Sequence, residues 1–97
     1  MAVPNFFTGS KTGITTTAVS LSDEDLHAQR GVQIVAATGN ANPIYIGHSA
    51  SVTADSAEST DGYPLSAGES IVIPVKDPNG IYVISAAGTG KAFYVSV

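Results

Sequence analysis

The chain has 97 residues, the usual length of one domain with one modest core, and 43% of them are apolar whereas only 12% are charged. Its net charge is −4, and the four basic residues are scattered along the chain, which argues against binding of nucleic acid through a basic surface. No stretch reaches the roughly 18 apolar residues of a membrane span. The absence of cysteine excludes disulfides and thiolate metal sites, so packing and association must stabilise the fold.

Residues 1–12 predict an extended N-terminal arm, because Pro4, Gly9 and polar residues surround a single apolar pair, Phe6 and Phe7. Two adjacent phenylalanines are costly to leave in water. We therefore expect the arm to lie against its own domain or against a neighbouring subunit. The start MAVPNFF lacks the features of a signal peptide, which predicts synthesis in the cytoplasm. Residues 13–97 are expected to form one domain.

Short runs of β-branched and alternating apolar residues dominate the rest of the chain. They predict strands at residues 13–21, 32–38, 44–46, 51–53, 71–75, 81–86 and 91–97, with a further short extended piece within 63–70. Ser22 and the acids after it predict a single helical turn. Residues 54–62 are polar without a period and predict an exposed loop. Asp77–Gly80 has the residue order of a type I turn.

Seven or eight short strands separated by turns are typical of a β-sandwich or a jelly roll. No helix of ten or more residues can be drawn in the sequence. The predicted fold class is therefore all-β: an antiparallel, jelly-roll-like sandwich with an extended N-terminal arm.

From Arg30 to the C-terminus the order of motifs resembles a family of small structural proteins of tailed bacteriophages. The resemblance rests on RGVQIVAA, NPIYIGHSASVT, GYPLSAGESIVIPV and IYVISAAGTGKAFYV, which together cover about two-thirds of the chain. It implies a virion component such as a capsid decoration, cement or head-fibre protein. The partner that it implies is the major capsid protein or another virion protein, and the location is the capsid surface.

Two sequence patterns resemble parts of catalytic sites, but each lacks residues or geometry that catalysis requires. Gly88–Lys91 lacks the earlier glycine and the following helix of a phosphate-binding loop, so it predicts a hairpin turn. His48 and Ser49 adjoin, but neighbouring side chains of an extended segment point to opposite faces, so His48 is poorly placed to activate Ser49. We therefore expect no enzyme, no catalytic residue and no cofactor.

Two acidic groups and the tyrosines were considered as binding sites. The cluster of Asp23, Glu24, Asp25 and His27 lacks the ligand spacing of a calcium loop, as do the acids of residues 55–61. These groups predict solvated turns, and no metal is expected. The four tyrosines, Tyr45, Tyr63, Tyr82 and Tyr94, favour core-edge or interface positions over a sugar-binding platform.

The leading hypothesis is a virion structural subunit that docks on a capsid, with a homo-oligomer as the expected assembly and a trimer as the favoured order. The alternative is a receptor- or glycan-binding module displayed on a head or tail fibre. In that case, polar and aromatic side chains around residues 55–63 would converge on a concave patch. Arg30, which opens the second strand, could pair with an acid of the Ser22–Asp25 turn, and an ion pair within the chain or at an interface is expected. The candidate interface residues are Phe6, Phe7, Arg30, Tyr45, His48 and Tyr63.

Overall fold

The computed structural model describes residues 7–22, 28, 30–56 and 58–97. In these residues the chain forms eight strands and one 3-10 turn. Sheet A contains, in spatial order, β1 (Thr8–Ile14), β8 (Gly90–Ser96), β3 (Val32–Ala36) and β6 (Ser70–Ile73). Sheet B contains β2 (Val19–Ser20), β7 (Tyr82–Ser85), β4 (Ile44–Gly47) and β5 (Tyr63–Leu65). All the strand pairs of both sheets are antiparallel.

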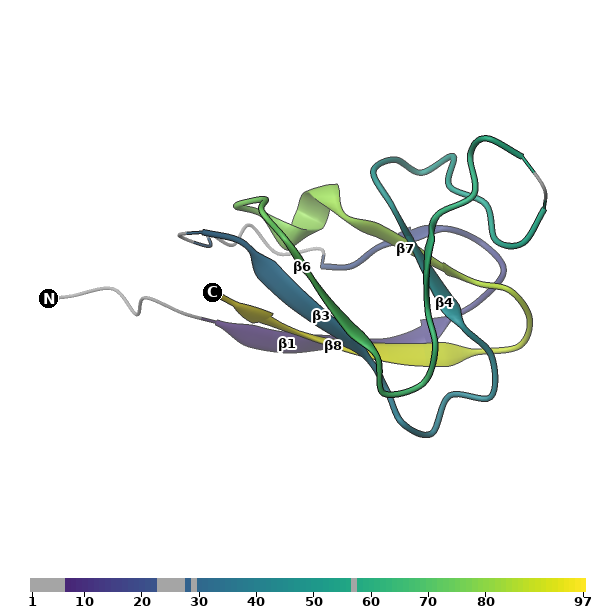
Figure 1. Ribbon diagram of the computed structural model, residues 1–97, viewed down its shortest axis with the longest axis horizontal. Coiled ribbons are helices and arrows are strands. Elements are labelled where there is room, and N and C mark those ends of the chain that lie inside the picture. Colours follow the sequence, from purple (N-terminus) through teal and green to yellow (C-terminus); the bar gives the residue numbers. More distant parts are fainter. Residues whose placement is uncertain (1–6, 23–27, 29, 57) are drawn as a thin grey trace, which may run out of the picture.

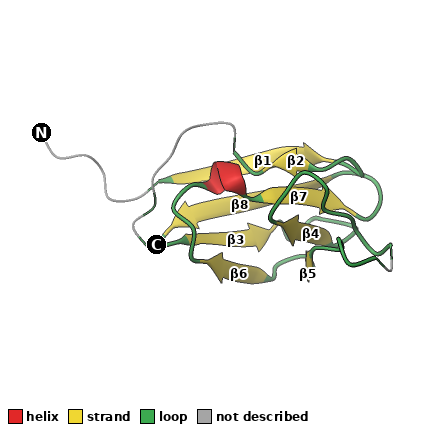
Figure 2. Ribbon diagram, turned by 90° about the horizontal axis from the view of Figure 1, so that it is seen from above, coloured by secondary structure: helices red, strands yellow, loops and turns green. Residues whose placement is uncertain are grey.

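The pairing is that of a jelly roll. The pairs β4–β5, β3–β6, β2–β7 and β1–β8 are nested, so the two halves of the chain run beside each other like one long hairpin. Its tip is the loop of residues 48–62. Two further pairs, β3–β8 and β4–β7, roll this hairpin into two layers. Figure 1 shows the layers, and Figure 2 shows the four strands of each sheet side by side.

The alternation of the sequence places the core between the layers. Strand β3 buries Val32, Ile34 and Ala36 and leaves the residues between them half-buried. Side chains from sheet B close the same core, which includes Ile44 and Val83. The predicted all-β sandwich is therefore confirmed.

The N-terminal boundary of the sandwich was predicted wrongly. Residues 8–12, which were assigned to the arm, belong to β1, which pairs with β8 from Thr8 onwards. The predicted strand at 13–21 is divided, because β1 ends at Ile14 and the chain crosses to sheet B, where β2 begins at Val19. Within β1, Gly13 has a φ of 63°, and the register with β8 shifts between Lys11 and Ile14 before pairing resumes at Ile14.

Three smaller predictions also needed correction or fall outside the described residues. The strand expected at 51–53 is a single parallel bridge between Thr53 and Asp61. Strand β6 ends at Ile73, before Pro74, because proline cannot donate a ladder hydrogen bond. Most of the helical turn expected after Ser22, including the acids at 23–25, lies outside the described residues.

The turn at Asp77–Gly80 is confirmed. The Asp77 carboxylate accepts a hydrogen bond of 2.9 Å from the backbone N–H of Asn79, and residues 78–80 form the 3-10 turn η1 (Pro78–Gly80). This capping places Ile81 at 3% exposure, directly before β7.

Candidate functional site

The outer face of sheet A carries two rows of side chains, which follow from the strand register. One row crosses the sheet as Thr8, Val95, Gln33 and Val72, and the next as Ser10, Phe93, Val35 and Ser70. We call these eight residues the sheet A face. Together they contain four apolar and four uncharged polar side chains. A shallow depression runs between them.

The sheet A face presents large apolar groups to solvent. Val72 is 53% exposed and Phe93 is 42% exposed. Beside Phe93 lies Lys91, whose Nζ is 4.8 Å from the centre of the phenyl ring. This geometry is a cation–π contact, which places one positive charge at the margin of the face. The eight residues of the face are uncharged and partly apolar, and Lys91 adds one positive charge at the margin, a composition that suits a surface that binds protein.

A second candidate site is a cavity of about 410 Å³ beside the loop of residues 48–62. We call it the loop cavity. Its apolar lining comes from β4, from β6 and the residues after it, and from the loop itself: Ile46, Val52, Ile71, Ile73, Val75 and Ile81. Polar groups from the loop and the aromatic ring of Tyr63, the first residue of β5, complete the lining; the loop residues are His48, Ser49, Ser51, Ser59, Thr60 and Asp61.

Val52 holds the loop of residues 48–62 against the sandwich. Its side chain is 6% exposed and lies against Gly47 and Gly62. A Cβ on Gly47 would lie 2.3 Å from Cγ2 of Val52, and a Cβ on Gly62 would lie 2.6 Å from the carbonyl oxygen of Ile46. Glycine at these two positions is therefore what allows the loop to pack closely.

Asp61 organises the inner part of the same loop. Its Oδ1 accepts hydrogen bonds from Thr53 Oγ1 at 2.7 Å and from Ser56 Oγ at 2.6 Å, and the backbone N–H of Ser56 also donates to the carboxylate. Backbone bonds from Thr53 N to Thr60 O and from Gly62 N to Thr53 O join the two sides of the loop. This exposed and polar segment is thus a connected structure around one carboxylate.

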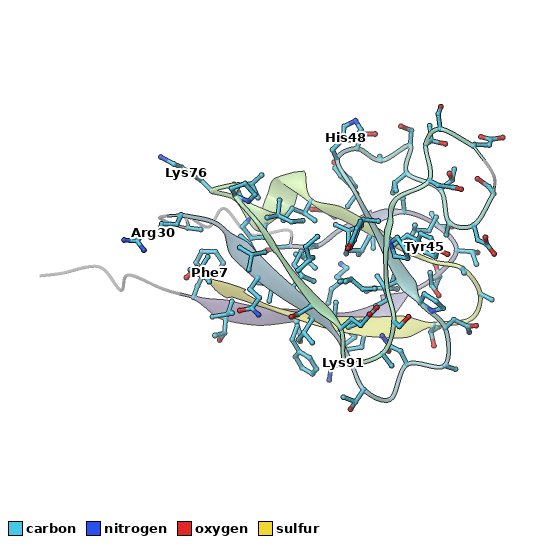
Figure 3. All side chains as sticks on the ribbon, in the orientation of Figure 1. Phe7, Arg30, Tyr45, His48, Lys76 and Lys91 are labelled. Carbon is cyan, nitrogen blue, oxygen red and sulfur yellow. The ribbon has the colours of Figure 1, made fainter. Side chains whose placement is uncertain are left out.

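The structure brings together only part of the predicted interface residues. His48 and Tyr63 both line the loop cavity, and Tyr63 is 59% exposed. Tyr45 lies on the outer face of sheet B, opposite Ile84 and Pro64. Figure 3 shows Arg30 and Phe7 near the other end of the molecule from Tyr45.

Phe7 packs against its own domain. Its ring makes an edge contact with Tyr94 at 6.3 Å between centroids, and its backbone N–H and C=O both bond to Ser96. Phe6 lies outside the described residues. Arg30 is exposed, and its backbone N–H donates to the carbonyl of Val97. The acids expected to pair with Arg30 lie outside the described residues.

The apolar residues of the sheet A face, above all Val72 and Phe93, were missed. Strand β8 alternates in burial, yet both of its faces carry apolar side chains, as the run Ala92 to Val95 shows. Apolar residues on both faces of one strand were the sequence signal that could have indicated an exposed apolar surface.

The structure places the two sequence patterns considered for catalysis beside strand ends: residues 48–49 follow β4, and residues 88–91 lead into β8. Gly88 has a φ of 65° in the turn between β7 and β8, but these two strands lie in different sheets and do not pair, so the predicted hairpin is wrong and the turn connects the two layers. Ser49 Oγ lies 2.7 Å from Ser51 Oγ. Within the described part of the chain, no group of three His, Cys, Asp or Glu residues is arranged to hold a metal ion. The described residues also contain no helix that could span a membrane.

The four tyrosines do not form one platform, because Tyr94 is 7% exposed in the core while Tyr63 lies at the loop cavity. Comparison of the chain with protein-family models, with curated proteins and with solved structures found no match.

Proposed function

We propose that the chain is a virion structural protein that docks through its sheet A face on the capsid of a tailed bacteriophage, as a decoration or cement subunit. The observation that carries the proposal is the neutral, partly apolar sheet A face, with Val72 and Phe93 exposed. The jelly roll, a fold that recurs in viral capsid domains, supports it. So do the low charge of the chain and the motifs that resemble phage structural proteins.

The size of the sheet A face suggests how such a subunit would bind. Four strands spaced about 4.8 Å apart, with β8 extending about 23 Å, give a face of about 440 Å². A standard interface uses about 800 Å² on each partner. One sheet A face therefore supplies about half of a standard interface, and stable attachment requires further contacts or several linked subunits.

Repetition on a shell supplies the missing binding energy. If subunits associate with one another, for example as the trimer expected from the sequence, each added contact becomes intramolecular and strengthens attachment without new chemistry. The partner is then a regularly repeated, uncharged protein surface such as that of the major capsid protein. The bound decoration subunits would keep neighbouring capsid subunits from separating.

The test introduces charge into the sheet A face. Val72→Glu and Phe93→Glu place a carboxylate at exposed positions, so the domain should remain folded while docking weakens at least tenfold, since a charge would be desolvated at the contact. Thr16→Glu is the matched control, because Thr16 is exposed in the β1–β2 connection, outside the face.

Occupancy is measured by native mass spectrometry or mass photometry of purified tailed-phage capsids mixed with each variant. Loss of occupancy in both face variants, with Thr16→Glu unaffected, supports the proposal. Unchanged occupancy in the face variants refutes docking through this face. Because the eight residues of the face are uncharged and Lys91 adds a single charge at the margin, occupancy should also change little between low and high salt.

A further inference from the structure

We propose that the loop cavity binds a neutral N-acetylated sugar. This inference goes beyond capsid docking, and it concerns a different surface. The cavity combines an apolar floor with a polar rim, and each part matches one half of an acetamido sugar.

The floor of the loop cavity fits a small apolar group. Ile46, Ile73, Val75 and Ile81 contribute aliphatic side chains, and Val52 closes one side. The methyl of an acetamido group gains from burial among such side chains, whereas a sugar hydroxyl placed there would lose its hydrogen bonds to water. The floor therefore favours a sugar with an acetyl group over the same sugar without one.

The rim of the loop cavity suits the sugar ring and its hydroxyl groups. Ser51, Ser59 and Thr60 are exposed and carry hydroxyl groups that both donate and accept hydrogen bonds. Tyr63 adds a largely exposed aromatic ring, against which the C–H face of a pyranose can stack. Few polar groups around an apolar pocket are the usual composition of a small-molecule site.

The charges around the loop cavity select against acidic sugars. Asp55 and Glu58 are exposed in the same loop, and the carboxylate of Asp61 lies in the lining. Among the described lining residues the remaining titratable side chains are His48 and Tyr63, so an anionic ligand would meet negative charge without a permanent cation. These charges therefore disfavour an acidic sugar and are compatible with a neutral one.

The loop cavity is organised before any ligand arrives. Val52 packs against Gly47 and Gly62, and the hydrogen bonds to Asp61 join Thr53 and Ser56. A site held in this way loses little conformational freedom on binding. Figure 3 shows His48, at this cavity, on the opposite side of the molecule from Lys91, at the margin of the sheet A face. A docked subunit would thus leave the cavity open to solvent.

The experiment titrates the full chain with N-acetylglucosamine, and in parallel with glucose, while amide shifts are followed by NMR. A ligand of this size typically reaches a Kd of about 1 mM. We expect saturable shifts at Ser51, Thr60 and Tyr63 with the acetylated sugar, and an affinity for glucose at least fivefold lower. Saturation transfer should be strongest at the acetyl methyl.

Two variants and one control separate the parts of the inference. Tyr63→Ser removes an exposed ring and should weaken binding at least fivefold without unfolding. Val75→Thr keeps the side-chain volume but replaces a methyl group of the floor by a hydroxyl. It should therefore weaken the binding of N-acetylglucosamine and leave the binding of glucose unchanged. Tyr82→Ser, on the outer face of sheet B, should have no effect. Absence of shifts at the loop cavity, or equal affinity for both sugars, overturns the proposal, whatever the outcome of the capsid experiment.

Discussion

Val52→Ala should destabilise the domain by about 2 kcal/mol. Val52 is 6% exposed, so the substitution removes two buried methyl groups, each contributing about 0.8 kcal/mol of transfer free energy, and leaves a small cavity between Gly47 and Gly62. For a domain of this length, this loss corresponds to a Tm lower by about 10 °C.

Val72→Ala is the matched control, because it makes the same chemical change on the sheet A face, where Val72 is 53% exposed. It should cost about 0.5 kcal/mol, the range of surface substitutions. Urea denaturation followed by circular dichroism gives both free energies of unfolding. The difference between the two valines, about 1.5 kcal/mol, isolates the contribution of burial beneath the loop.

Hydrogen exchange shows where the loss occurs. The amides of Thr53 and Gly62 join the two sides of the loop, and their protection should fall about 30-fold in Val52→Ala if its 2 kcal/mol is lost when the loop opens. Gly47→Ala should be at least as damaging, because its Cβ would lie 2.4 Å from Cβ of Val52 as well as close to Cγ2. Equal unfolding free energies for Val52→Ala and Val72→Ala would refute the assigned role of Val52.

Two further substitutions test other contacts. Asn40→Ala should lower the free energy of unfolding, measured by urea denaturation, by about 2 kcal/mol, because the side-chain amide of Asn40 donates to Lys91 O and accepts from Lys91 N. Asn42→Ala loses one exposed hydrogen bond to Ala87 O and should cost about 0.5 kcal/mol. Equal losses would contradict this assignment. Phe7→Ala should lower the free energy of unfolding of the isolated chain by about 1 to 2 kcal/mol, because the Phe7 ring packs on Tyr94 of its own domain. If the dilute, monomeric variant kept the Tm of the unmodified chain, the ring would have to act in contacts with other molecules.

The sequence by itself determined the fold class and most of the strands. Strand β3 was recognised because Val32, Ile34 and Ala36 recur with the period of two that one buried face imposes. The turn at Asp77–Gly80 was recognised because its residue types favour that backbone locally. Both signals depend on near neighbours in the chain, and so they can be read without knowing the partners.

Only the tertiary structure decided where β1 begins and which surfaces matter. Residues 8–12 carry a weak strand pattern of their own, and they become a strand because β8 satisfies their backbone groups from more than 80 positions along the chain. The sheet A face likewise depends on the register of four strands, which places Val72, Phe93 and Val35 on one outer face. The loop cavity depends on Val52 packing against two glycines. Contacts between distant segments create these features, and no local pattern records such contacts.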